Sequence, residues 1–165
     1  MSFWDSQSAW FLLLLLVLPG LGVSDSVAAS QRGVANEARA KTNYMLNCQG
    51  CHGPDAAGND AADVPRMKDF VGNFFRVEGG REFLVQVPGS SSASVDDAQL
   101  AELLNWMIPH FSENQLPENY VPYTESEVTR LRYTPEDDVV GKRRKLVDAI
   151  KALDLPVSSD YDQSE

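Results

Sequence analysis

The chain has 165 residues, with 14 basic and 24 acidic side chains, and its formal net charge is −10. An acidic surface of this kind argues against binding to nucleic acid or to anionic lipid. With only two cysteines and two histidines, the chain cannot build a disulfide framework and has few ligands for several metal centres.

The chain begins with an apolar run over residues 9–23, which is short for a membrane span and is interrupted by Pro19. Small residues up to Ala29 offer a cleavage site, so residues 1–29 are predicted to be a signal peptide. The usual basic start is absent, and Asp5 stands there instead. An uncleaved membrane anchor therefore stays open as an alternative. Either way the rest of the chain is expected outside the cytoplasmic membrane, with a charge of about −8 if the signal is removed.

A helix predicted over residues 36–47 leads into Cys48-Gln-Gly-Cys51-His52. C-x-x-C-H is the attachment signature of c-type haem: two thiols can form thioethers with the porphyrin vinyl groups, and the following imidazole can bind the iron. A thioredoxin-like redox pair would need a βαβ setting, which the flanking sequence does not have. A structural zinc site needs four ligands, and the chain adds only His110. The sequence predicts one covalently attached haem c.

Residues 53–60 are rich in glycine, proline and aspartate, which predicts a loop able to bend around a macrocycle. An aromatic cluster at residues 70–75 follows. Residues 82–87 are read as a short helix or an extended piece, and residues 88–93 as a loop of small side chains.

The clearest helix is predicted to begin at Ser94, whose hydroxyl can cap the Asp97 backbone N–H, and to stop at Pro109. One side of it is apolar at helical spacing: Leu100, Leu103, Leu104, Met107 and Ile108.

The remaining chain is predicted as an extended strap over residues 111–123 and two helices. Thr124 begins a capping-box pattern for a helix through Arg132. The second helix is predicted to begin at Thr134 and Pro135. Its apolar positions recur at helical spacing: Val139, the aliphatic stem of Arg143, Leu146, Ile150 and Leu153. Residues 157–165 are expected to form a flexible acidic tail.

The order of helix, C-x-x-C-H, loop, Val-Pro and final helix resembles the class I cytochrome c family over roughly residues 36–108. The resemblance implies a small all-α fold in which the first and last helices cross beside one covalent haem. Residues 30–110 would form this haem domain, and residues 111–156 a strap and helices that pack on it.

The resemblance also implies roles for individual residues. Cys48 and Cys51 would carry the thioethers, and His52 would be the proximal iron ligand. The carbonyl of Pro65 would accept a hydrogen bond from the His52 ring, which fixes the imidazole. Trp106 would meet the first helix. The dry wall of the pocket is expected to come from Phe70, Phe74, Trp106 and Leu104.

The sixth iron ligand is the main departure from the family. The family supplies a methionine from the loop before the last helix, and residues 88–93 contain none. Met107 is the first candidate, followed by Met67 and then His110, and a vacant position is also open. Met67 would pack on the histidine side if the resemblance holds. A thioether ligand suits electron transfer, whereas an open position admits small ligands.

The resulting hypothesis is a periplasmic monohaem c-type cytochrome, an electron-transfer protein and not an enzyme. It would carry single electrons between partners such as an exported dehydrogenase and a terminal oxidase, and its acidity favours a partner with a basic docking patch. Two alternatives stay open. One is a haem-based sensor or ligand-binding module with an open sixth position, and the other is a haem-bearing docking subunit of a larger redox complex.

Overall fold

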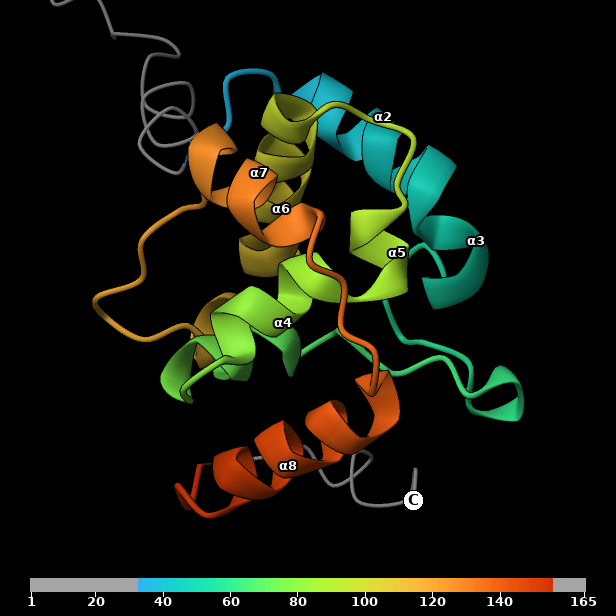
Figure 1. Ribbon diagram of the computed structural model, residues 1–165. Helices are drawn as coiled ribbons and strands as arrows, with labels where there is room; N and C mark the ends of the chain where they lie inside the picture. Colours follow the sequence, from blue (N-terminus) through green and yellow to red (C-terminus); the bar gives the residue numbers. More distant parts are fainter. Residues whose placement is uncertain (1–32, 156–165) are drawn as a thin grey trace, which may run out of the picture.

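The computed structural model describes residues 33–155, so the predicted signal peptide and the acidic tail lie outside the described residues. Within that range the chain is helical and forms no strand, which confirms the all-α prediction (Figure 1). The elements are α2 (Glu37–Asn47), α3 (Gln49–His52), η1 (Asp60–Ala62), η2 (Val71–Arg76), α4 (Gly80–Gln86), α5 (Pro88–Ser91), α6 (Asp97–Ser112), η3 (Glu113–Gln115), α7 (Glu125–Arg132) and α8 (Val139–Lys151).

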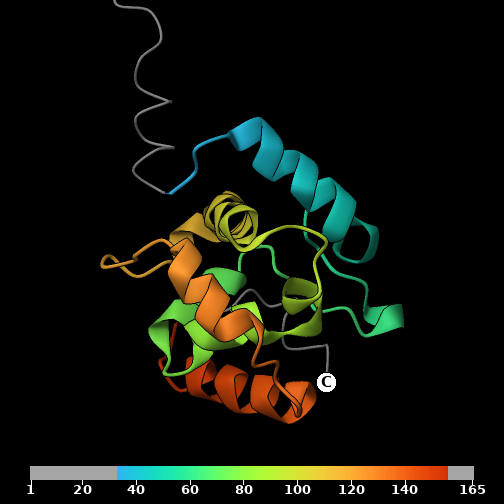
Figure 2. The same cartoon turned by 45° about the horizontal axis from the view of Figure 1, so that its top comes forward.

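Helices α2 and α6 cross, as the resemblance implies (Figure 2). Buried Ala40 and Tyr44 belong to the inner side of α2, and the Tyr44 ring lies 5.9 Å from that of Trp106 on α6. Arg39 forms an ion pair with the nearly buried Glu102, at 2.7 Å between Nε and Oε2. Apolar packing between the two helices and this ion pair at the edge of their contact therefore fix how they cross.

The limits of α6 differ from those predicted. The cap is Asp96, whose carboxylate accepts a hydrogen bond from the Gln99 backbone N–H at 2.8 Å. Ser94 is not the cap; its own N–H donates to the Asn47 side chain. Pro109 does not stop the helix, because Phe111 continues the buried face beyond it and packs on Tyr44 with ring centroids 5.0 Å apart. Tertiary packing outweighs the single N–H donor that a proline removes.

The predicted strap and loop are shorter than expected. Because α6 runs to Ser112 and η3 follows at once, the extended stretch begins only at Leu116. The predicted loop over residues 88–93 holds a helical turn, α5, which begins with Pro88 at its first position.

Helix α7 begins as predicted, with the Thr124 hydroxyl accepting a hydrogen bond from the Glu127 N–H at 3.2 Å. The start of α8 was predicted wrongly: Asp138 caps it, while the Thr134 hydroxyl donates to the Leu131 carbonyl at the end of α7. A proline after a threonine is equally compatible with a turn, and here α7 ends in that turn. Helix α8 packs under η2 and α4, at the bottom of Figure 1.

Among residues 33–155, every helix is too short or too polar to cross a lipid bilayer.

Candidate haem site

The C-x-x-C-H segment lies where α2 ends and the single turn α3 begins. The Cys48 carbonyl accepts hydrogen bonds from the N–H groups of Cys51 and His52, at 3.2 and 3.0 Å. Helical spacing therefore places the two thiols on neighbouring positions of one turn. The Tyr44 hydroxyl donates to the Gly53 carbonyl at 2.7 Å and ties the end of the turn to α2. Burial raises the pKa of Tyr44 to about 12, so the hydroxyl keeps its proton for this bond at neutral pH.

The His52 ring is oriented by the chain. Its Nδ1 lies 3.1 Å from the Pro65 carbonyl oxygen, which can only accept, so Nδ1 carries the proton and donates. Nε2 is then the unprotonated nitrogen, the form that binds a metal. Burial lowers the pKa of His52, which also favours the neutral ring. The contact between His52 and Pro65 that the resemblance implies is present.

The two cysteines form no disulfide with each other. Cys48 is partly buried, and this burial together with the nearby Cys51 raises its pKa to about 11. Reactive redox cysteines have a lowered pKa that supplies the thiolate. The raised pKa and the absence of strands among the described residues both argue against the thioredoxin-like alternative.

Cys48 and His52 border a cavity whose walls are mainly apolar. The cavity brings together residues from α2, α3, η2, α4, α5, α6 and α8 and from the loops between them. Its described lining consists of Asn47, Cys48, His52, Pro65, Arg66, Met67, Val71, Phe74, Phe83, Leu84, Val87, Gly89, Ser90, Leu104, Ile108, Val139 and Arg143. An oriented imidazole and a thiol at the edge of an apolar cavity fit a haem that is attached at the motif.

The predicted pocket residues divide into two groups. Phe74 and Leu104 line the cavity. Phe70 and Trp106 are buried but are not part of the lining. Phe70 packs edge-on against Phe74 at 5.8 Å, and the Trp106 Nε1 donates to Glu37 at 3.4 Å. Phe70 therefore supports the wall from behind, whereas Trp106 belongs to the contact between α6 and α2.

The three candidates for the sixth iron ligand also differ in position. Met107, the first choice from sequence, is buried and does not line the cavity. His110 is exposed and stacks on Trp106, with ring centroids 4.6 Å apart. Met67 lines the cavity, and it follows Pro65, the hydrogen-bond partner of His52, by two residues. The turn over residues 88–91 contributes only Gly89 and Ser90 to the lining.

Sequence reasoning missed part of the wall. Leu84 and Val87 come from the end of α4, which the sequence left undecided between helix and extended chain. Val139 and Arg143 come from α8. Their common helical face was predicted, but nothing local indicates that this face reaches a cavity built from residues far earlier in the chain.

A motif that ends one helix, a crossing of that helix with α6 and an apolar cavity at the motif define a c-type cytochrome, an electron-transfer protein with covalently attached haem c. Comparison with known proteins supports the same class. The chain is 29% identical over 156 residues to a cytochrome c-552 of Thermus thermophilus, in an alignment that covers 82% of this chain and 95% of the relative. It is also 29% identical over 120 residues to a second cytochrome c-552 of Thermus thermophilus, covering 60% of this chain and 90% of the relative.

The longer alignment covers more of the chain than residues 1–110 contain, so it includes part of the segment after His110. No family model and no solved structure matches the chain.

Proposed function

We propose that the chain is a periplasmic monohaem c-type cytochrome that carries single electrons between redox partners. Cys48 and Cys51 hold the haem through thioethers, and His52 is the proximal ligand. The observation that carries this proposal is the His52 ring, held by the Pro65 carbonyl at 3.1 Å with Nε2 unprotonated, directly after the two thiols. The haem supplies the ferric–ferrous change.

The protein's own residues contribute orientation and exclusion of water. The Pro65 carbonyl holds the imidazole and increases its donor strength. Phe74, Leu104 and Ile108 give the cavity an apolar wall, and Phe70 packs behind it on Phe74. A dry and rigid pocket reduces the reorganisation that accompanies a change of iron charge.

Of the three candidates for the sixth position, Met107 and His110 do not line the cavity, and the one that does is Met67. The same residue also gives the second candidate function its support. Met67 follows Pro65, the hydrogen-bond partner of His52, by two residues. It would therefore lie on the same side of the haem as His52, and a sixth ligand is needed on the other side. If no side chain reaches that face, the protein is a sensor or ligand-binding module.

The partner and the compartment follow from charge and from the predicted signal peptide. A net charge of −10 favours a partner with a basic docking patch, by steering during encounter. The third possibility, a haem-bearing docking subunit, would use residues 111–156 to bind a larger redox complex. It is supported when replacement of the exposed Val121 and Val140 by alanine removes partner binding and leaves the haem spectrum unchanged.

The test is to express the full chain with export and haem-attachment machinery, and to record oxidised and reduced spectra. We expect haem that stays with the polypeptide on a denaturing gel and sharp reduced bands that carbon monoxide does not shift. A shift with carbon monoxide would favour the ligand-binding module. A colourless protein with two alkylatable thiols contradicts the whole proposal. The mass of the exported protein checks the predicted mature start at Ser30.

A further inference from the structure

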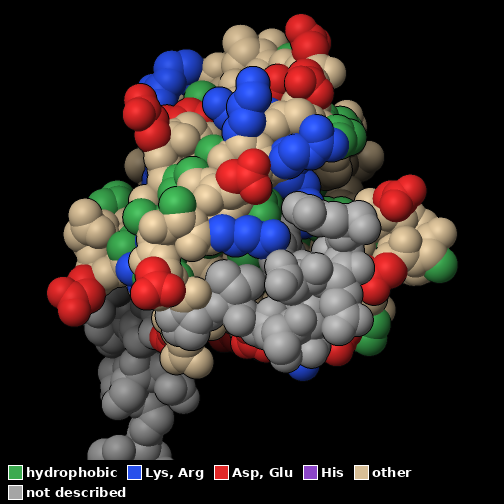
Figure 3. Space-filling view, turned by 90° about the horizontal axis from the view of Figure 1, so that it is seen from below, with side chains coloured by type: hydrophobic (Ala, Val, Ile, Leu, Met, Phe, Trp, Pro, Cys, Tyr) green, Lys and Arg blue, Asp and Glu red, His purple; other side chains and the backbone are tan. Residues whose placement is uncertain are grey.

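Helix α8 differs in charge from the rest of this acidic chain. Lys142, Arg143, Arg144 and Lys145 follow one another, and Asp148 is the single acidic residue within the helix. Figure 3 views the molecule from below, the side on which α8 lies, and lysine and arginine side chains gather there.

Neighbouring arginines of this helix face different surroundings. Val139 and Arg143 line the cavity and, at helical spacing, share a face with buried Leu146 and Ile150. Arg144 is exposed and is not part of the lining. Of these two adjacent arginines, one therefore lies at the cavity and the other is exposed to solvent.

The cavity lining is positive although the protein is negative. Among the described residues that line it there is no aspartate or glutamate, and there are two arginines, Arg66 and Arg143. Arg66 already donates from Nε to the Lys68 carbonyl at 3.0 Å and from a terminal nitrogen to the Asp69 carboxylate at 3.4 Å. An apolar cavity that has arginines and no acidic residue in its described lining suits a flat apolar ligand that carries carboxylates.

We propose that Arg143 binds a propionate carboxylate of the haem, so that α8 supplies a counter-ion as well as a wall of the pocket. This rests on the proposed haem site. The ferrous form carries one positive charge fewer than the ferric form, so a nearby cation stabilises it. Arg143 therefore raises the reduction potential.

The experiment uses the haem-loaded full chain and three variants: Arg143→Gln, Arg143→Lys and the matched control Arg144→Gln. Spectroelectrochemistry measures the ferric–ferrous equilibrium, and resonance Raman measures the propionate bending mode. We expect Arg143→Gln to shift the equilibrium up to tenfold towards the ferric form, which is about 59 mV for one electron. Arg143→Lys should recover most of the potential with an altered Raman mode, and Arg144→Gln should change neither readout.

Equal shifts for Arg143→Gln and Arg144→Gln would show a general charge effect and overturn the proposal, as would an unchanged propionate mode in Arg143→Gln. If Arg143→Gln does not fold, Arg143→Lys decides: an altered mode supports the contact, and an unaltered mode overturns it. Wild-type protein without attached haem would instead contradict the proposed function, so the two failures are distinguishable.

Discussion

Two regions of this molecule share one apolar core but differ in how much they depend on polar contacts. The haem shell, residues 33–112, is built mainly on apolar packing, with Tyr44, Phe70 and Leu100 fully buried. The C-terminal segment, residues 113–155, packs on the shell through buried apolar side chains of α7 and α8, and polar side chains also reach across between the two regions in both directions. The segment completes the shell, because it contributes both to the cavity wall and to the loop before α6.

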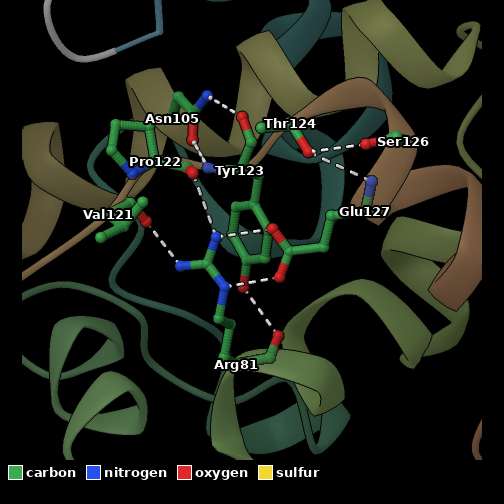
Figure 4. A network of polar contacts seen from close by, with 8 residues as sticks. All are labelled: Arg81, Asn105, Val121, Pro122, Tyr123, Thr124, Ser126 and Glu127. Carbon is green, nitrogen blue, oxygen red and sulfur yellow. Dashed lines mark hydrogen bonds and ion pairs between the residues drawn. The ribbon is translucent and has the colours of Figure 1, made fainter.

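The first set of polar contacts between the two regions comes from a side chain of the shell. Arg81 on α4 donates both Nε and a terminal nitrogen to the Glu127 carboxylate, at 2.6 and 2.7 Å, and also binds the Val121 and Pro122 carbonyls (Figure 4). The Arg81 guanidinium carbon lies 4.2 Å from the centre of the buried Tyr123 ring. Such a bidentate, stacked arrangement is specific to arginine.

An uncharged side chain of the shell adds two hydrogen bonds to this set of contacts. The Asn105 side chain accepts from the Tyr123 N–H at 2.7 Å and donates to the Tyr123 carbonyl at 3.0 Å, as Figure 4 shows. The Asn105 side chain thus satisfies the backbone N–H and carbonyl of Tyr123, which a neighbouring strand would satisfy in a sheet.

The second set of polar contacts comes from a side chain of the C-terminal segment. Arg132 on α7 is buried, and its guanidinium donates to the carbonyls of Ser91, Ala93 and Val95 and to the Asp97 carboxylate. Two of these acceptors, Ser91 and Ala93, belong to residues 88–93, the loop in which the class I resemblance leads one to expect a methionine. The C-terminal segment therefore fixes the backbone that borders the cavity.

The largest effect should come from breaking the shell at its motif. Replacing Cys48 and Cys51 together by alanine leaves no thiol in the chain, so no thioether can form. We expect complete loss of haem from the polypeptide on a denaturing gel. The control is Met45→Ala, an exposed position on α2 three residues before the motif, which should keep the haem. Covalent haem in the double variant would refute the assignment.

The next largest effect should come from Arg132→Met. The change leaves three backbone carbonyls and the Asp97 carboxylate without this donor, and breaking a buried pair of this kind costs about 4 kcal/mol. Denaturant unfolding measures the loss in free energy of unfolding. Arg130→Met, exposed on the same helix, should stay within about 0.5 kcal/mol. Equal losses in the two variants would mean that the hydrogen bonds of Arg132 contribute little to stability.

A somewhat smaller effect is expected from Ile150→Ala, which truncates a fully buried side chain of α8. The expected loss is about 3 kcal/mol in free energy of unfolding, from lost burial and a residual cavity. Val140→Ala on the same helix, 70% exposed, should be nearly neutral. If both regions unfold as one unit, absorbance of the haem and circular dichroism should report a single transition. Two separate transitions would show that the regions are independent.

The smallest effect should appear only in acid. Hydrogen bonds from Arg81 lower the pKa of Glu127 below its ordinary value. The unfolded chain therefore binds a proton at higher pH than the folded chain. The stabilising contribution is present above the ordinary pKa and is lost as the pH falls through the folded value.

Glu127→Gln should consequently flatten the fall in free energy of unfolding below about pH 4.5. The Gln variant should also be less stable than wild type at neutral pH. Glu125→Gln, an exposed neighbour on α7, is the control. An unchanged acid slope in Glu127→Gln would mean that this pair does not contribute to acid sensitivity.

The sequence by itself determined the elements whose cause is local. The C-x-x-C-H motif, the cap of α7 at Thr124 and the apolar face of α6 all follow from neighbouring residues, and so does the all-α class. The proximity of His52 and Pro65 followed from family resemblance, and the hydrogen bond between them is present.

Only the tertiary structure decided where α6 ends and what closes the cavity. Pro109 is a stop signal by local rules, but packing of Phe111 on Tyr44 carries the helix past it. Val139 and Arg143 reach the cavity only because α8 packs under η2 and α4, contacts that join segments far apart in the chain. Contacts of that range depend on how whole faces fit together, and a local pattern does not encode that fit.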